Sequence, residues 1–456
     1  MLLRAPRRPL APKGAMKRTL LFAALAVACA SPHDEPKTKT TTAPVRTQKP
    51  RVTPETVLLR PRTQAELPTT DAKIFLGNLD ARVSAGSKVW KKNPGSSAAA
   101  LLYAGPRVAR GKLHGDLGEI SAGLDDIEAA LAKSPRDPSL LALASSTLST
   151  MHRFDEALTL AEKAHELRPD SASRATLADL RYNLGQYDES IPEIRALAER
   201  HPTFGSLVKL AHLEQDLGNV TEAEQAFACA ETLFRDVSPL PIAWLNVQRG
   251  LFYLHTGRFD RAEAFYRAAV ERLPSYPMAL EHLAELEGVV GKTAAAEKHY
   301  RKVIALTNDP EFLGALSRIL EKKGQHAEAD ELLAQAKKRY AKLIRKYPEA
   351  MAWHAAELFL SAGDAKRAVE LLTDNAKLRP NAVSYAALAK AELEAGNLEA
   401  AATNVDRALA TPLRRADILW TAARVRKAQG KSAEAERLAH DARAQNPKIE
   451  VLEGSL

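Results

Sequence analysis

Cysteine is almost absent from the 456-residue chain, which contains only Cys29 and Cys229. Two cysteines cannot build a disulfide framework, so the chain is not a disulfide scaffold. No window approaches the roughly 18 consecutive apolar residues of a membrane-spanning helix. The chain also lacks a Gly-x-Ser-x-Gly elbow, a phosphate-binding loop, a His-Glu-x-x-His motif and a dinucleotide fingerprint, so the sequence gives no reason to assign catalysis or a cofactor.

Excess positive charge is confined to the N-terminal part of the chain. The net charge is +9, of which residues 1–29 carry +6 and residues 30–69 carry +3, so the remaining 387 residues sum to zero. The positive charge is thus confined to a leader and a tail, which leaves no electrostatic footprint for a polyanion on the folded part. This distribution therefore argues against a nucleic-acid partner.

The leader reads "MKRTLLFAALAVACASPHDEP" from Met16, which we take as the true start. A basic pair, ten uncharged residues and small residues before Cys29 are typical of a secretory signal peptide, here residues 1–28. The leader resembles a bacterial lipoprotein signal, which implies lipidation of Cys29, although Ala26 stands where that family prefers Leu. An ordinary signal peptide with an incidental cysteine is the alternative. Ala30 after the cysteine is the residue type that implies outer-membrane sorting in enteric bacteria.

Export with a lipidated Cys29 would leave Cys229 as the one thiol and no possible intramolecular disulfide. Cys229 lies among small apolar residues on a predicted helix. We expect a buried structural thiol there, because a catalytic thiol needs a base and an activating environment.

Residues 29–70 are rich in Pro, Thr and Lys and lack a helical apolar stripe. Such a composition predicts an extended, disordered segment, which could reach roughly 120 Å as a polyproline-like chain. After an anchored cysteine it would act as a lipid-anchored tether.

One phrase recurs through the rest of the chain: "GQYDESIPEIRALAERHP" at 185–202 returns as "GRFDRAEAFYRAAVERLP" at 257–274. Its first residue recurs about every 34 residues, at Gly118, His152, Gly185, Gly218, Gly257, Gly291, Gly324, Gly363, Gly396 and Gly430. A small residue stands seven residues before and five residues after each of these positions, which lets two antiparallel helices cross closely. In six units a Pro stands seventeen residues after the recurring position, where a helix must end.

These features resemble the tetratricopeptide repeat, and the resemblance implies an all-α fold, a right-handed α-solenoid of about ten helix-turn-helix units over residues 97–449. Two spacings are 39, and we place the extra residues in "FRDVSPLPIAW" and "LLAQAKKRYAKLIRKYP". Residues 71–96 look like an N-terminal helix that caps the open end of the solenoid. Residues 450–456 remain as a C-terminal tail.

In this family the first helices of successive units line a concave groove. The corresponding places here, in the central and C-terminal units, hold tryptophans, carboxylates and cations. The candidate groove-binding residues are Trp244, Glu281, Glu285, Arg318, Trp353, Glu357, Lys390, Trp420 and Arg424. Trp concentrates binding energy at interfaces, but each Trp could equally pack against the next helix.

Two His-x-x-Glu pairs, His282 with Glu285 and His354 with Glu357, occupy the same place in their units. Such a pair can ligate a metal ion only with further ligands nearby. The pairs are two units apart, or about 20 Å at usual helix-packing distances, so they should not share one ion. We therefore expect solvated groove pairs and no metal.

The sequence thus predicts a non-catalytic scaffold or adaptor for protein–protein interaction, which binds a polypeptide partner in its groove. Its layout is similar to that of bacterial tetratricopeptide-repeat lipoproteins, which implies anchoring in the cell envelope, at the outer membrane. The alternative is a soluble exported accessory protein that binds a small ligand or a metal through the groove. Fold alone does not decide between them.

Overall fold

The structure is a computed structural model that describes residues 58–456. The predicted signal peptide, Cys29 and the tether up to residue 57 lie outside the described residues. Within them every regular element is a helix. The helices are α1 (Ala72–Lys92), α2 (Ser97–His114), α3 (Leu117–Leu131), α4 (Pro138–Thr150), α5 (Phe154–Leu167), α6 (Ser171–Asn183), α7 (Tyr187–Arg200), α8 (Phe204–Asp216), α9 (Val220–Thr232), α10 (Pro239–His255), α11 (Phe259–Arg272), α12 (Pro277–Val289), α13 (Thr293–Leu306), α14 (Pro310–Lys322), α15 (His326–Lys346), α16 (Pro348–Ser361), α17 (Ala365–Leu378), α18 (Ala382–Glu394), α19 (Leu398–Leu409), α20 (Ala416–Ala428), α21 (Ser432–Gln445) and α22 (Ile449–Glu453).

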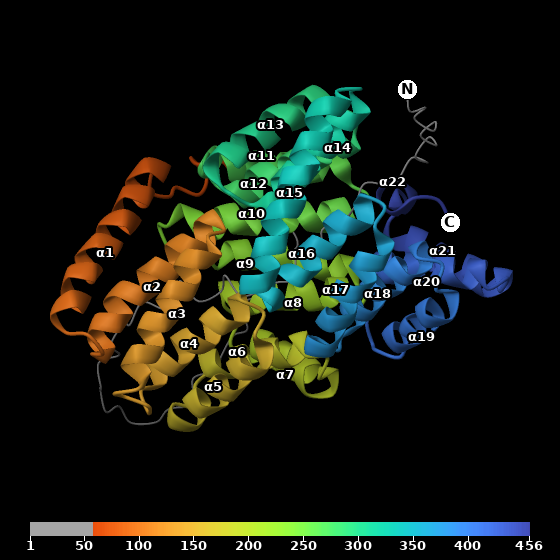
Figure 1. The fold of residues 1–456 in the computed structure, drawn as a ribbon. Helices are drawn as coiled ribbons and strands as arrows, with labels where there is room; N and C mark the ends of the chain where they lie inside the picture. The colour runs from red at the N-terminus through yellow and green to blue at the C-terminus, as the bar shows by residue number, and fades with distance from the viewer. Residues whose placement is uncertain (1–57) are drawn as a thin grey trace.

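Helices α2 to α21 form ten consecutive helix-turn-helix pairs, in which each helix packs most closely on its partner and then on the next pair. The predicted α-solenoid of about ten units is thereby confirmed. Figure 1 shows the pairs following one another along a superhelix, with α1 at one outer edge.

Glycines in the left-handed backbone region make the tight turn inside the pairs. Gly185 has φ 75° and Gly324 has φ 76°, a conformation that costs glycine little. His152 fills the predicted place without glycine and is the one described non-glycine residue with positive φ, at 61°. The first unit differs from the prediction: Gly115 takes the left-handed turn at φ 69°, and Gly118 lies inside α3.

The small residues at the helix crossings are in direct contact, as their spacing predicts. The Ser145 hydroxyl donates to the carbonyl of Ala157 at 2.8 Å, and the Ser317 hydroxyl donates to the carbonyl of Ala329 at 2.7 Å. These bonds join the two predicted positions of one unit. At the same place in α10, a Cβ on Gly250 would lie 2.3 Å from the Tyr266 ring, so only glycine fits there.

The predicted ends and insertions of the units also fit the helix bounds. Helix α5 ends two residues before Pro169, and α11 ends two residues before Pro274. The second long unit has its extra residues in α15, which is 21 residues long. The first long unit has its extra residues in the irregular stretch 233–238 and in α10, which is 17 residues long.

Helix α1 packs along α2 as the predicted cap, and residues 58–70 continue from it onto distant units. The Arg272 guanidinium donates to the carbonyls of Leu67 and Arg62 at 2.9 and 3.2 Å. The Arg249 guanidinium donates to the carbonyl of Leu58 at 2.7 Å. The sequence places residues 58–70 in a disordered tether, whereas the structure shows them bound to α10 and α11. We call residues 58–70 the strap.

The superhelix completes a turn, and its later units pack on its earlier ones. The Asn381 amide donates to the carbonyl of Asn183 at 2.7 Å, across 198 residues of sequence. The backbone N–H of Arg414 donates to the carbonyl of Asp216 at 2.8 Å. Tyr347 shares one buried cluster with residues of α2 to α6. The molecule is therefore a coil of two stacked layers.

Candidate binding groove

Five successive first helices, α12, α14, α16, α18 and α20, line two neighbouring pockets on the inner side of the units. The larger pocket lies between α16, α18 and α20, with an empty volume of about 580 Å³. The smaller one lies between α12, α14 and α16, with about 380 Å³. Glu357 lines both pockets, so the two are parts of one groove.

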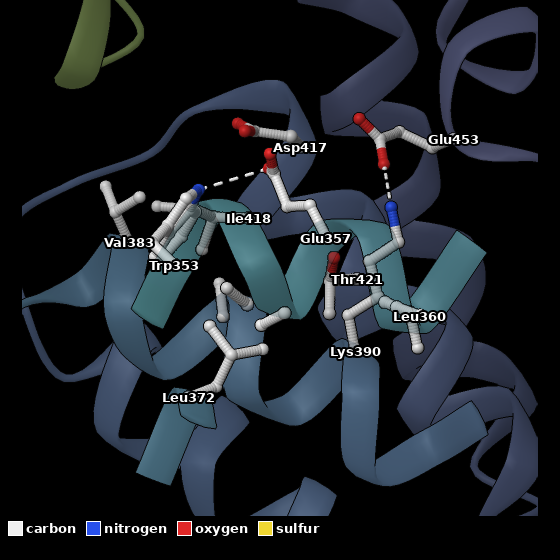
Figure 2. A pocket seen from close by; sticks show the side chains of 13 residues that line it. Trp353, Glu357, Leu360, Leu372, Val383, Lys390, Asp417, Ile418, Thr421 and Glu453 are labelled. Carbon is white, nitrogen blue, oxygen red and sulfur yellow. Dashed lines mark hydrogen bonds and ion pairs between the residues drawn. The ribbon is translucent and has the colours of Figure 1, made fainter. Parts of the chain in front are cut away.

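The larger pocket has an apolar floor and a charged rim. Leu372, Val383 and Ile418 are aliphatic residues of its lining; Figure 2 shows Leu372 at the bottom of the view and the carboxylates of Glu357 and Asp417 close together at the top. The small residues Ala356 and Ala386 also line this pocket. An aliphatic side chain could enter such a pocket with a charged neighbour at the rim.

Two polar contacts fix the side chains of the rim. The Trp353 indole donates to Glu357 Oε1 at 3.1 Å, from one turn earlier in α16. The Lys390 ammonium donates to Glu453 Oε2 at 2.8 Å, which ties α18 to α22. Burial opposes the charged amine of Lys390, but the Glu453 carboxylate outweighs it and raises the pKa of Lys390.

The smaller pocket is lined in part by four carboxylates, from Glu281, Glu285, Glu311 and Glu357. Behind them His282 is fully buried, with its Nδ1 3.0 Å from Glu281 and 3.4 Å from Glu285. Burial acts against the charged ring, but the two carboxylates outweigh it and raise the pKa of His282 to about 9. His282 is therefore an imidazolium at neutral pH. The predicted solvated pair is wrong here, because no part of this ring reaches solvent.

Each His-x-x-Glu pair has the further carboxylate that a metal site would need. The ligand atoms of Glu281, His282 and Glu285 lie within 4.8 Å of one another, as do those of Glu311, His354 and Glu357. Residues of both pairs line the smaller pocket, which the sequence did not predict. These two sets are where a divalent cation could be held, although the proton on His282 would have to leave first.

The other predicted groove residues have different surroundings. Trp420 is fully buried, and its indole donates to the carbonyl of Gly454 at 3.1 Å. Trp244 is half-buried against the large core cluster of α8 to α12. Arg424 forms an ion pair with Glu394 at 2.9 Å. None of these three lines either pocket, whereas Glu281, Glu285, Arg318, Trp353, Glu357 and Lys390 do.

Sequence reasoning missed the residues that the C-terminus and α20 contribute. Glu453 belongs to α22, which folds back on α20, in a stretch the sequence leaves as a tail. Asp417 lines the larger pocket and pairs with Arg415 at 2.7 Å. The apolar spacing in "KIEVLE" could have indicated a short helix, but nothing local shows what it packs against.

Cys229 is partly buried in α9, and burial raises the pKa of its thiol. A raised pKa keeps the thiol protonated, which is the opposite of the activation that a nucleophile needs. Its surroundings agree with a structural thiol.

Two stretches of the chain match the tetratricopeptide repeat family, residues 175–233 and residues 243–286. A comparison with curated proteins finds no match.

Among solved structures the fold is similar to the APC/C hetero-tetramer Cut9-Hcn1, at 17% identity and a TM-score of 0.35, over 78% of this chain and 62% of that one. It is also similar to a tetratricopeptide repeat protein from Parabacteroides merdae, at 17% identity and a TM-score of 0.34, over 55% of this chain and 97% of that one. A third is the human IFIT1 dimer with PPP-AAAA, at 17% identity and a TM-score of 0.40, over 81% of this chain and 87% of that one. Within residues 58–456, no helix is both long enough and apolar enough to cross a membrane.

Proposed function

We propose that this chain, which carries tetratricopeptide repeats in residues 175–233 and 243–286, is a non-catalytic scaffold that binds a polypeptide in the groove of α12 to α20. The observation that carries the proposal is the pair of adjoining pockets, one with an apolar floor and both with charged walls. Repeats of this kind generally bind protein or peptide partners, and fold alone would not assign the ligand.

The spacing of the pockets favours an extended chain as ligand. Neighbouring first helices in a solenoid lie about 8–10 Å apart. An extended peptide advances about 3.3 Å per residue, and its side chains alternate between two faces. Side chains on one face of such a peptide lie two residues, or about 6.6 Å, apart, so an extended chain can direct a series of side chains toward successive units. A small molecule would occupy only one of the two pockets, whereas a peptide could pass Glu357 and occupy both.

The cellular setting that we propose is the bacterial envelope, with the chain exported and lipidated on Cys29 at the outer membrane. The leader from Met16 and the position of Cys29 support this part of the proposal. Fractionation tests it: the full-length chain should sediment with membranes, and a Cys29→Ala variant should be released. Unchanged sedimentation of the variant would count against lipid anchoring. Recovery with inner-membrane markers would count against the outer membrane.

A random peptide library displayed against the purified full chain tests the binding function. We expect peptides that are enriched on the wild type and lost on Ala387→Phe, because a phenyl ring at residue 387 would fill the larger pocket that this residue lines. A Glu370→Phe variant is the control, since residue 370 is exposed on α17 and lines neither pocket. A library that yields no peptide sensitive to Ala387→Phe would contradict the proposal.

A further inference from the structure

We infer that the segment bound in this groove is basic, with Lys or Arg side chains on either side of one aliphatic residue. The inference rests on the proposed function and names the chemistry of its partner. It follows from the charge of the two pockets, from the apolar floor of the larger one and from their order along the units.

Among the charged residues that line the groove, carboxylates outnumber cations. Arg318 and Lys390 are the permanent cations among the residues that line the two pockets, and Lys390 is paired with Glu453. Against these two stand six acidic residues: Glu281, Glu285, Glu311, Glu357, Asp417 and Glu453. Two more cations lie directly behind the lining, His282 beside Glu281 and Glu285 and Arg415 paired with Asp417, so the acids exceed the cations by two. The residues from 70 to 456 sum to zero net charge, so the excess of acid in the groove is a local feature. A cationic segment would be attracted to this groove and an anionic one repelled.

The acidic residues are spread along the groove. Glu281 and Glu285 come from α12, Glu311 from α14, Glu357 from α16 and Asp417 from α20. One small cation would use a single set of these groups. A chain with several basic side chains could use groups on successive units, which is the spacing that an extended peptide offers.

The larger pocket adds a requirement for one apolar side chain. Leu372, Val383 and Ile418 are aliphatic, and the Trp353 ring lies beside them, with its indole nitrogen turned to Glu357 (Figure 2). Removal of an aliphatic side chain from water into such a pocket is favourable. The carboxylates of Glu357 and Asp417 stand at the same pocket and would meet basic residues next to that side chain.

Three synthetic peptides test the inference by fluorescence anisotropy with the full chain. The first has about 12 residues, enough to span several units, with two Lys on each side of a central Leu in a Ser and Gly background. The second replaces each Lys by Glu, and the third replaces the Leu by Ser. We expect the basic peptide to bind at least tenfold more tightly than either of the others, and its affinity to fall as salt is added.

Amide substitutions in the groove locate the effect. Glu285→Gln with Glu357→Gln removes two charges but keeps side-chain size and the acceptor for Trp353, and it should weaken the basic peptide about tenfold. The matched control is Glu370→Gln with Asp374→Asn, two exposed acids on α17 that line neither pocket. It should bind the basic peptide as the wild type does. Thermal melting of each variant checks that the fold is retained.

The outcomes separate this inference from the function on which it rests. If library peptides depend on the groove but the acidic or the uncharged sequences bind as well as the basic one, the inference is wrong and the scaffold function stands. If the control variant loses binding as much as the groove variant, the basic peptide is attracted to the surface in general and the inference is again wrong. If no peptide of any kind binds, both fail.

Discussion

At the scale of single residues, His282 couples the protonation of a buried ring to the stability of the fold. It is fully buried between Glu281 and Glu285, and its ring stacks on Tyr266. Its pKa is raised to about 9 from an ordinary value of 6.5. A raised pKa means that the folded state binds the proton more tightly, so this stabilisation is complete below about pH 6.5 and is lost as the pH rises through 9.

We expect the free energy of unfolding to fall by about 2–3 kcal/mol between pH 7 and pH 10 through this residue alone. Chemical denaturation at several pH values measures it, as the difference between the wild type and His282→Gln, because subtraction removes the titration of other groups. His440→Gln is the control, since that ring is exposed. Parallel curves for the wild type and His282→Gln would show that the ring is neutral in the fold.

Trp420→Ala and Trp353→Phe should differ in their cost to stability, because both side chains are buried and only the second change keeps an aromatic ring. Trp420 is fully buried, so Trp420→Ala should cost about 3–5 kcal/mol through the cavity it leaves. Trp353→Phe keeps an aromatic ring beside the pocket and loses the bond to Glu357, so it should cost only about 1 kcal/mol. Denaturant melts give both values. Equal, small losses would mean that Trp420 is not packed as described.

The sequence period was sufficient to place Glu281, Glu285, Trp353 and Glu357 on the groove side, because position within a repeat decides which face a residue takes. The period could not decide whether Trp420 is exposed in the groove or buried in the core. That residue is covered by α22 and Gly454, and the return of the chain over α20 is a tertiary contact with no local signal.

Among elements, the strap gives the clearest test, since four of its groups accept hydrogen bonds from one guanidinium. Arg272 donates to Gln64, Leu67, Thr69 and Arg62 of the strap. Arg272→Met should keep the aliphatic packing, lose these bonds and cost about 2–3 kcal/mol. Hydrogen exchange should then speed up at the Thr70 amide, which donates to the carbonyl of Val237. Arg267→Met, at an exposed position on the same helix, should leave that amide protected.

The turns and helix pairs could be predicted because each rests on residues that are close in sequence. The left-handed Gly185 and the proline after α5 are examples. The strap could not, because its composition is that of a disordered segment. Its order comes from Arg249 and Arg272, about 200 residues further along the chain.

For the whole molecule, the stacking of the two layers should be measurable through two matched glycines. Gly185 and Gly324 have nearly the same φ, so alanine at either one carries a similar backbone strain. A Cβ on Gly185 would also lie 2.3 Å from the carbonyl oxygen of Pro380 in the other layer, whereas a Cβ on Gly324 would meet nothing within 4 Å. Gly185→Ala should therefore be more destabilising, by about 1–3 kcal/mol.

Small-angle scattering on the same pair should show a larger radius of gyration for Gly185→Ala than for Gly324→Ala, because the clash separates the layers. Identical stability and size in the two variants would contradict the stacking. Closure of this kind could not be predicted from the period. It depends on the pitch accumulated over about six units, and the contacts that fix it, such as Asn381 with Asn183, are 198 residues apart.

The central claim is that a polypeptide lies in the groove of α12 to α20, and site-specific photo-crosslinking tests it most directly. A photoreactive amino acid at residue 360, where it replaces the large Leu360 side chain that lines the larger pocket, is compared in living cells with the same amino acid at residue 370, outside both pockets. The account predicts a crosslinked polypeptide from residue 360 that is absent from residue 370 and is lost with Glu285→Gln and Glu357→Gln. No crosslink from residue 360, or equal crosslinks from both positions, would contradict it.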